Sequence, residues 1–415
     1  MSFVRLALRN LARNRRRTAA TLGVVAAGTV ALVLTAGFVR FSFDGLREAM
    51  IHGGLGHLEV ASGAAVAAQG PAALDRPLAE ALADWQALAE RLAALDHVVA
   101  VGANLQVLGL AQSATGASFS FIGVGVEPER ERAMGFETRL RAGAPLPDAA
   151  PAAGEETALL ARGLAASLGA GVGDVVTLVA TSADGMLNAL DVRVAGIVTT
   201  GVAELDTRYL KVHLATASRL LQTDRVSNLL VGLDDTAATD AALAAARAAL
   251  AGHAPALAVT PWTARATFYE QVQNLYRGIF WFLGSIVFVL VVLAASNTLA
   301  MTVMERIREL GTLRAIGTGR GQLAAMILAE ALWLGVFGAL IGGAAGLATT
   351  AALNAAGLQM PPPPGAVDPI DLQLAYVPEA YLASALLMVV VLAVAALPPI
   401  ARAVRLSIVE ALGHV

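Results

Sequence analysis

Residues 278–317 read GIFWFLGSIVFVLVVLAASNTLAMTVM followed by ERIRELGTLRAIG. The first part, 278–304, is 27 residues long and carries no charge. A helix of about 20 apolar residues, rising about 1.5 Å per residue, crosses a hydrocarbon core of roughly 30 Å. The second part is charged from its first residue. The stretch therefore predicts a transmembrane helix that runs directly into a short charged segment.

Other uncharged runs of spanning length predict a membrane protein with four helices. We expect these transmembrane helices at 18–42, 276–304, 323–350 and 379–401. The chain of 415 residues is 57% hydrophobic and 15% charged, with a mean hydropathy of +0.66. Soluble proteins average about 45–50% apolar and about 25% charged residues. This composition excludes a purely soluble enzyme, and the crowding of charges into some stretches excludes a protein embedded in lipid throughout.

The distribution of arginine predicts the orientation in the membrane, because short cytoplasmic segments are enriched in basic residues. Residues 1–17 carry six arginines and no acid, and 305–320 carry four arginines against two glutamates. The segment 44–277 has 16 basic and 25 acidic residues. We therefore expect a cytoplasmic amphipathic helix at 1–17, a cytoplasmic segment at 305–320 and a cytoplasmic tail at 402–415. The domain at 43–275 and the loop at 351–378 should face the outside.

The segment 43–275 is long enough to fold as an extracytoplasmic domain of mixed α and β structure. Periodicity predicts strands near 57–61, 98–110, 117–126, 175–180, 192–199, 209–214 and 228–233, and helices near 80–95, 157–168 and 240–250. We expect an inserted subdomain at about 134–227. The fold class is therefore a four-helix membrane protein with a large α+β domain between helices 1 and 2.

The sequence gives no support for catalysis in this chain. It has no cysteine, and its single lysine, Lys211, is not part of a Gly-x4-Gly-Lys-Ser/Thr phosphate loop. His52, His57 and Glu59 are close in sequence, but their spacing matches no metal motif, and structural polar residues are the simpler interpretation. We expect no catalytic residue, no metal and no cofactor in this chain. Any ATP must act through another subunit.

The segment 305–320 continues the second transmembrane helix as a predicted amphipathic helix. Its apolar stripe is Val303, Ile307, Leu310, Leu313 and Ile316, and its charged residues off the stripe are Arg306, Arg308, Glu309 and Arg314. Two interpretations fit this pattern. The helix rests on lipid headgroups, or it docks on a cytoplasmic partner.

The third expected transmembrane helix has two notable features. Gly338, Gly342 and Gly346 repeat at every fourth position, which lets a neighbouring helix approach closely. Glu330 is a carboxylate near the cytoplasmic end of this helix, and intramembrane carboxylates are functional by default. It could also reach the interface or pair with an arginine of the 305–320 segment.

Several segments together resemble FtsX-like/MacB-type ABC transporter permeases. The main one is Glu305-Arg306-x-Arg308-Glu309-x-Gly311-x-Leu313-Arg314-Ala315-x-Gly317, with the start at 8–11 and the tail at 408–412. The segments at 56–60 and 360–365 are most like the lipoprotein-release (LolC/LolE) branch. The order of one helix, a large outer domain and three helices covers the whole chain.

The resemblance implies a non-catalytic permease in the bacterial inner membrane, with both termini cytoplasmic. Its partners would be two copies of an ABC ATPase that bind ATP and Mg, a second permease of the same or a homologous chain, membrane lipids, and a periplasmic adaptor or lipoprotein carrier. No nucleic acid is expected. The residues expected to couple to the ATPase are Arg306, Ile307, Arg308, Glu309, Leu310 and Arg314.

The function implied is transmission of ATP-driven motion to the outer domain, which would move a lipoprotein or another lipophilic envelope substrate. Two alternatives remain open from the sequence. One is an FtsX-like regulator that transports nothing and activates an extracytoplasmic enzyme. The other is a sensor of antibiotic peptides.

Overall fold

The computed structural model describes residues 15–69, 78–136, 139–253, 255–360 and 370–405. The chain divides into two compact units. The helical unit contains Met1–Asp44, Val272–Met360 and Asp371–Val415, and the α+β domain contains Gly45–Gln271 with Pro361–Ile370. The expected helix at 1–17 and tail at 402–415 fall mostly outside the described residues.

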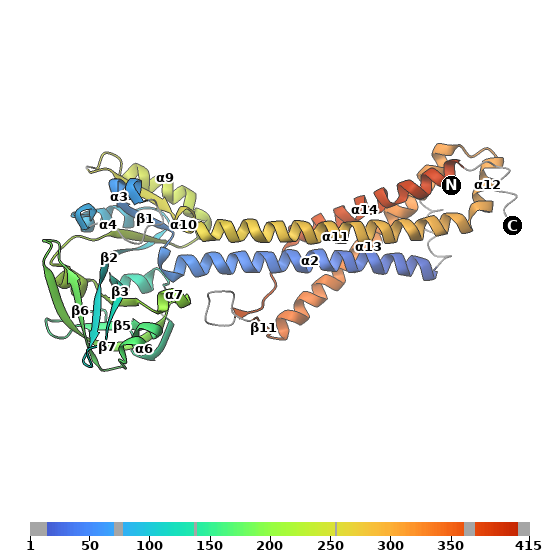
Figure 1. Cartoon of the computed structure of the whole chain (residues 1–415). Coiled ribbons are helices and arrows are strands. Elements are labelled where there is room, and N and C mark those ends of the chain that lie inside the picture. Colours follow the sequence, from blue (N-terminus) through green and yellow to red (C-terminus); the bar gives the residue numbers. More distant parts are fainter. Residues whose placement is uncertain (1–14, 70–77, 137–138, 254, 361–369, 406–415) are drawn as a thin grey trace. The chain divides into compact units, whose positions relative to one another are not determined.

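Four helices within the described ranges are long and apolar enough to cross a membrane. They are α2 (Arg15–Met50), α11 (Thr267–Glu305), α13 (Arg320–Ala355) and α14 (Pro378–Arg405) (Figure 1). Inside the helical unit they share an apolar core that includes Val25, Val291, Leu334 and Leu392. This confirms the expected membrane fold class.

These helices are longer than the spans expected from the sequence. An uncharged run ends at its first charge, whereas helical hydrogen bonding continues past it. In α2 the charges beyond the apolar run stabilise the helix themselves: Arg40 Nε donates to Asp44 Oδ2 at 2.7 Å, one turn away. The length of an apolar run therefore indicates what lipid can cover, and not where the helix ends.

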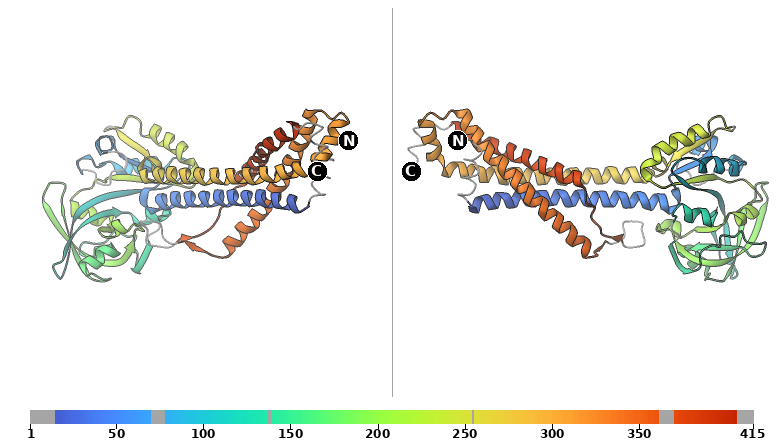
Figure 2. Two further views of the ribbon diagram at one scale, coloured as in Figure 1. Left: turned by 45° about the vertical axis from the view of Figure 1, so that its right-hand side comes forward. Right: turned by 180° about the vertical axis from the view of Figure 1, so that it is seen from behind.

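A short helix, α12 (Ile307–Ala315), connects α11 to α13. Both views in Figure 2 show it at one end of the helical unit, between these two long helices. Its C-terminal end is fixed by Gly317, whose φ of +104° is a left-handed value that favours glycine. The amide of Thr318 then donates to Leu313 O at 3.0 Å, which satisfies a carbonyl at the helix end.

The α+β domain is built around the long strand β2 (Val98–Ser113). The first half of β2 belongs to a central sheet in the order β10-β1-β9-β2. The other strands of that sheet are β1 (Leu58–Ser62), β9 (Asn228–Leu233) and β10 (Leu257–Pro261). β1 pairs antiparallel on both sides and is buried throughout. The chain segment that follows α2 therefore forms the interior of this sheet.

The second half of β2 belongs to a barrel. Among the described strands, pairings run β2-β3-β8-β5-β7-β6 and return from β6 to β2. These strands are β3 (Ser118–Val126), β5 (Thr157–Ala161), β6 (Val175–Thr181), β7 (Leu187–Thr199) and β8 (Tyr209–His213), and β4 (Arg139–Gly143) adds to β7. The barrel already begins in β2, before the start expected near 134 for an insertion.

Helices cover the two parts of the domain (Figure 1). Beside the central sheet lie α3 (Gly63–Gln69), α4 (Trp85–Ala93), α9 (Thr239–Ala249) and α10 (Trp262–Arg265). Beside the barrel lie α6 (Arg162–Leu168), α7 (Ala203–Asp206) and α8 (Leu214–Leu221), and α5 (Pro128–Ala133) follows β3. The short turns are η1 (Ile51–Leu55), η2 (Leu78–Glu80) and η3 (Thr236–Ala238), and β11 (Gln359–Met360) and β12 (Ile370–Asp371) form a separate pair.

One expected helix is wrong in its first half. The range 157–168 folds as strand β5 followed by helix α6. The sequence of this range is rich in alanine and leucine, which favour helix when considered locally. Here β5 is paired on both sides, with β7 and β8, and these ladders override the local preference.

Candidate functional site

The inward face of α12 packs against helices of its own unit. Ile307 and Leu310 are both buried. Leu310 belongs to an apolar cluster with Val303, Leu323, Met326, Ile327 and Ala403, from α11, α13 and α14. Ile307 and Leu310 thus contact helices of this chain, and their expected contact with an ATPase stays a prediction. The apolar stripe is used to fix α12 in place.

Arg306 connects α12 to the third long helix through an ion pair. Its Nη1 lies 3.0 Å from Glu330 Oε1 and 3.3 Å from Oε2, and its Nε lies 3.1 Å from Glu309 Oε2. The Arg306 side chain is 16% exposed and that of Glu330 is 9% exposed. Of the interpretations open for Glu330, pairing with an arginine of the segment is the one the structure shows. Arg306 therefore points into the bundle, toward Glu330 of α13.

The outward face of α12 is formed by residues off the predicted stripe, together with Ile316 from the end of the stripe. Arg308, Glu309, Thr312 and Ala315 are exposed, and Arg314 is half-buried. Ile316, the residue that ends the helix, is 75% exposed. The term "docking face" below means Arg308, Glu309, Thr312, Ala315 and Ile316.

The glycine repeat of α13 faces α2 within the helical unit. A Cβ atom built on Gly338 would lie 2.6 Å from Val25 Cγ1. One on Gly342 would lie 2.6 Å from Thr29 Cβ and 2.7 Å from Ala26 O, and one on Gly346 would lie 3.4 Å from Val33 Cγ1. Gly338 and Gly342 thus allow α2 to approach α13 more closely than alanine would permit, whereas an added Cβ at Gly346 would make an ordinary contact.

The α+β domain contains a buried ion pair that sequence reasoning missed. Arg265 Nε lies 3.1 Å from Glu59 Oε2, and both side chains are almost fully buried. Asn228 Nδ2 donates to the other carboxylate oxygen, and Arg265 Nη1 donates to Leu55 O at 2.8 Å. The pair joins β1 to α10, which are about 200 residues apart. No local pattern indicates such a partner, so burial of a charged residue could not be inferred for Glu59.

Lys211, the only lysine of the sequence, forms a largely buried ion pair with Glu131. Lys211 Nζ lies 3.0 Å from both carboxylate oxygens of Glu131, and both side chains are mostly buried. Burial by itself lowers the pKa of Lys211, but Tyr209 and Glu131 outweigh burial, and the pKa is raised. The side chain stays charged as one half of an ion pair between β8 and α5.

The histidines near the start of β1 do not form a metal centre with Glu59. Across the described ranges, no group of three His, Cys, Asp or Glu side chains is placed to hold a metal ion. Glu59 is taken up by Arg265 and Asn228, while the rings of His52 and His57 lie edge to face with centroids 6.2 Å apart.

Two family models match this chain. The model of the MacB-like periplasmic core domain matches residues 18–249, and that of the FtsX-like permease C-terminal matches residues 281–408. The first match alone spans more than half of the sequence. The chain therefore belongs to the FtsX-like ABC transporter permeases with a MacB-like periplasmic core domain, a family of multi-pass inner-membrane proteins, as the resemblance in the sequence indicated.

Individual relatives are more distant. A lipoprotein-releasing system transmembrane protein LolC of Neisseria meningitidis serogroup B (strain ATCC BAA-335 / MC58) is 26% identical over 195 residues, which is 46% of each chain. The chain thus aligns with about half the length of this relative. The periplasmic region of MacB from Actinobacillus actinomycetemcomitans is 16% identical and covers 54% of this chain and 96% of its own, with a TM-score of 0.36. The extracellular domain of the ABC-type transporter YknZ from Gram-positive bacteria is 15% identical and covers 49% and 98%, with a TM-score of 0.34.

Proposed function

We propose that this chain is the permease subunit of an ABC exporter or mechanotransmission complex and that α12 is its coupling helix. The observation that carries this proposal is the division of α12 into two faces. Ile307 and Leu310 fix the helix to its own bundle, while Ile316 is left exposed beside Arg308 and Glu309. An exposed apolar side chain beside charged residues is the arrangement of an anchor with a polar rim.

Motion of α12 would be transmitted to the long helices because α12 is continuous with α11 and packs against α13 and α14. It follows α11 with one non-helical residue between them, Arg306. That same residue pairs with Glu330 of α13, and the apolar cluster adds contacts from α13 and α14. A push on the docking face therefore moves at least two long helices together. Arg306 is in this view a positioning residue.

The partners follow from family membership and are part of the proposal. A separate ABC ATPase in two copies would supply ATP and Mg, and a second permease of the same or a homologous chain would complete the complex. The docking face and both termini would be cytoplasmic, and the α+β domain would lie outside. A periplasmic adaptor or lipoprotein carrier would receive the substrate. Similarity to a LolC protein, named as part of a lipoprotein-releasing system, favours a lipoprotein or another lipophilic envelope molecule.

The proposal is tested by Ile316→Asp in the complete complex in lipid nanodiscs. Burial of one large aliphatic side chain is worth roughly 1.5–3 kcal/mol, whereas an exposed ion pair contributes about 0–1 kcal/mol. Ile316→Asp should therefore lower copurification of the ATPase by about tenfold or more, and Arg308→Ala should have a small effect. The readouts are the amount of bound ATPase and its stimulation by the permease.

Leu310→Asp is unsuitable for this test, because it would place a charge in the cluster that fixes α12. The control is instead Thr312→Asp, which adds the same charge to the docking face without removing an apolar anchor. If Ile316→Asp binds and stimulates the ATPase like the wild type, α12 is not the coupling element. A helix that rests on lipid headgroups then becomes the better account of its exposed face.

A further inference from the structure

The chain leaves helix α2 through an irregular turn at the edge of the α+β domain. After Met50 the backbone forms the π-turn η1 (Ile51–Leu55), in which Gly54 has a φ of +118°, and Gly56 follows with a φ of +65°. The amide of Gly56 donates to Ile51 O at 3.0 Å, and β1 begins at Leu58. Single π-turns of this kind occur frequently at functional positions. Any side chain that fixes this turn controls how the last turn of α2 is held by its domain.

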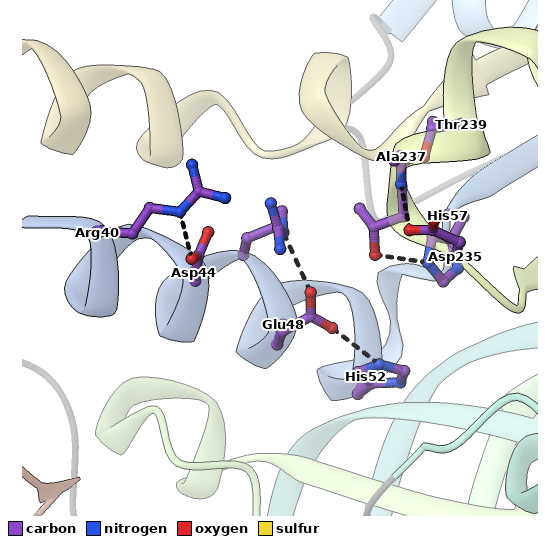
Figure 3. A network of polar contacts seen from close by, with 10 residues as sticks. Arg40, Asp44, Glu48, His52, His57, Asp235, Ala237 and Thr239 are labelled. Carbon is purple, nitrogen blue, oxygen red and sulfur yellow. Dashed lines mark hydrogen bonds and ion pairs between the residues drawn. The ribbon is translucent and has the colours of Figure 1, made fainter. Parts of the chain in front are cut away.

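His52, within this turn, has a hydrogen-bond acceptor opposite each ring nitrogen. Nε2 lies 3.1 Å from Oε2 of Glu48, one turn earlier in α2 (Figure 3). Nδ1 lies 3.2 Å from the carbonyl oxygen of Met134. A carbonyl and a carboxylate can only accept. A neutral imidazole has one N–H and can donate to one of them, whereas the doubly protonated ring donates to both.

The Met134 carbonyl is a fixed point of the domain. Met134 ends α5, and its side chain lies in a buried cluster with Ala100, Phe136 and Leu230. Gly102 of β2 and Gly232 of β9 leave room for the Met134 side chain against the central sheet. An added Cβ at these glycines would lie 2.7 and 2.6 Å from that side chain. The bond from His52 Nδ1 therefore holds the turn against β2 and β9.

The neighbouring His57 differs from His52 because one of its ring nitrogens faces a hydrogen-bond donor. Its Nδ1 accepts from the amide of Leu233 at 3.1 Å, so that nitrogen carries no proton, and its Nε2 lies 3.1 Å from Thr236 Oγ1. Burial lowers the pKa of His57, and the nearby His52 and Arg47 add to this effect. The bond from Leu233 and the lowered pKa both favour the neutral form of His57.

The other charged groups around His52 are engaged elsewhere. Arg47 Nε donates to Glu48 Oε1 at 3.1 Å, leaving Oε2 for His52. Asp234 pairs with His97. On α5 and the sheet behind it, Glu131 pairs with Lys211 and Arg132 with Asp148. Glu48 is therefore the charged group that faces the His52 ring directly.

We propose that His52 is a proton-operated latch that fixes the end of α2 and the π-turn to α5 and the central sheet. With both ring nitrogens protonated, the ring bridges Glu48 and Met134 and the latch is closed. Loss of one proton leaves a lone pair facing an oxygen, so one of the two bonds breaks and the turn is released. The attachment of the last turn of α2 and of the π-turn within the α+β domain then depends on the pH around that domain.

The test is hydrogen exchange of the full-length chain in nanodiscs at pH 5.5 and pH 8.0, corrected for the intrinsic exchange rate. Histidine ordinarily titrates between these values. In the wild type, amides of 48–56 should be protected about tenfold more at pH 5.5 than at pH 8.0, since a hydrogen bond to a charged group is gained. Amides of β9 report whether the domain is folded.

Two substitutions separate the latch from a general loss of structure. In Glu48→Gln the amide can present either its oxygen or its NH₂ group to the ring, so both proton states are satisfied. This variant should keep the protection of 48–56 at both pH values and lose the pH dependence. His52→Gln should lose the protection at both. His97→Asn, at an exposed histidine paired with Asp234, should behave like the wild type.

The latch is disproved if wild-type protection of 48–56 is the same at both pH values while β9 stays protected. It is equally disproved if Glu48→Gln or His52→Gln keeps the wild-type pH dependence. None of these outcomes depends on the ATPase, so a failure here leaves the proposed coupling function untouched.

Discussion

At the scale of single residues, the buried charges of the α+β domain are held by specific partners. Glu59 and Arg265 are the clearest case, because both are almost fully buried and belong to elements next to the two long helices in the sequence. Removing water from two charges costs several kcal/mol per ion, and only good geometry offsets this. The bonds from Asn228 to Glu59 and from Arg265 to Leu55 O provide that geometry.

Breaking this pair should destabilise the domain strongly. Arg265→Leu leaves the Glu59 carboxylate buried without its cation, which costs about 3–5 kcal/mol. The unfolding midpoint of the detergent-solubilised protein, followed by tryptophan fluorescence, should fall by roughly 10 °C. The double variant Glu59→Leu/Arg265→Leu buries no charge and should recover more than half of that loss. Equal loss in both variants would show that packing, and not charge, holds this position.

His213 makes the stability of the domain depend on pH. Its Nδ1 accepts the amide of Ala215 at 3.1 Å and so caps helix α8. Burial lowers the pKa of His213 below its ordinary value of about 6.5. As pH falls below about 6.5 the unfolded chain binds the proton first, so stability is present above this pH and is lost on acidification.

The variant His213→Asn isolates this contribution. Asparagine caps helices well and does not titrate. The difference in unfolding midpoint between wild type and variant should shift in favour of the variant as the pH is lowered from 7.5 to 5. A difference that is constant over this range would mean that His213 does not lose stability by protonation.

At the scale of elements, the sequence was sufficient for features that depend on neighbours along the chain. The uncharged runs predicted the four long helices, and the repeat Gly338, Gly342 and Gly346 marked one face of α13. Two features could not be predicted from the sequence. The burial of Leu310 depends on α13 and α14, and the Glu59 partner is about 200 residues away. The same amphipathic pattern describes a helix packed on its own bundle and one that awaits a partner.

Packing of α13 on α2 is tested by two adjacent glycines. Leucine at Gly342 would overlap with Thr29 and the backbone of Ala26, whereas at Gly343 no heavy atom lies within 4 Å of an added Cβ. Gly342→Leu should therefore destabilise the packing of α13 on α2 by about 1–3 kcal/mol and reduce assembly with the partner subunits. Gly343→Leu should assemble normally. The measurement is the yield of intact complex after size-exclusion chromatography, and equal yields would mean that this close approach is not needed.

At the scale of the whole molecule, the absence of cysteine from the sequence allows each site to be labelled alone. Met186 in the α+β domain and Ile316 on the docking face are both exposed. If the domain faces outside, a membrane-impermeant maleimide should label Met186→Cys in intact spheroplasts. It should label Ile316→Cys only after the membrane is permeabilised. The reverse pattern would invert the proposed orientation.

The central claim is that ATP bound by a partner acts through α12 on the α+β domain. The most direct measurement is the distance between spin labels at Met186→Cys and Leu358→Cys, one in each compact unit, in the assembled complex in nanodiscs. The account predicts that the distance distribution changes when ATP is added and that Ile316→Asp abolishes this change. A distribution that stays the same with ATP while the bound ATPase is active, or a change that persists in Ile316→Asp, would contradict it.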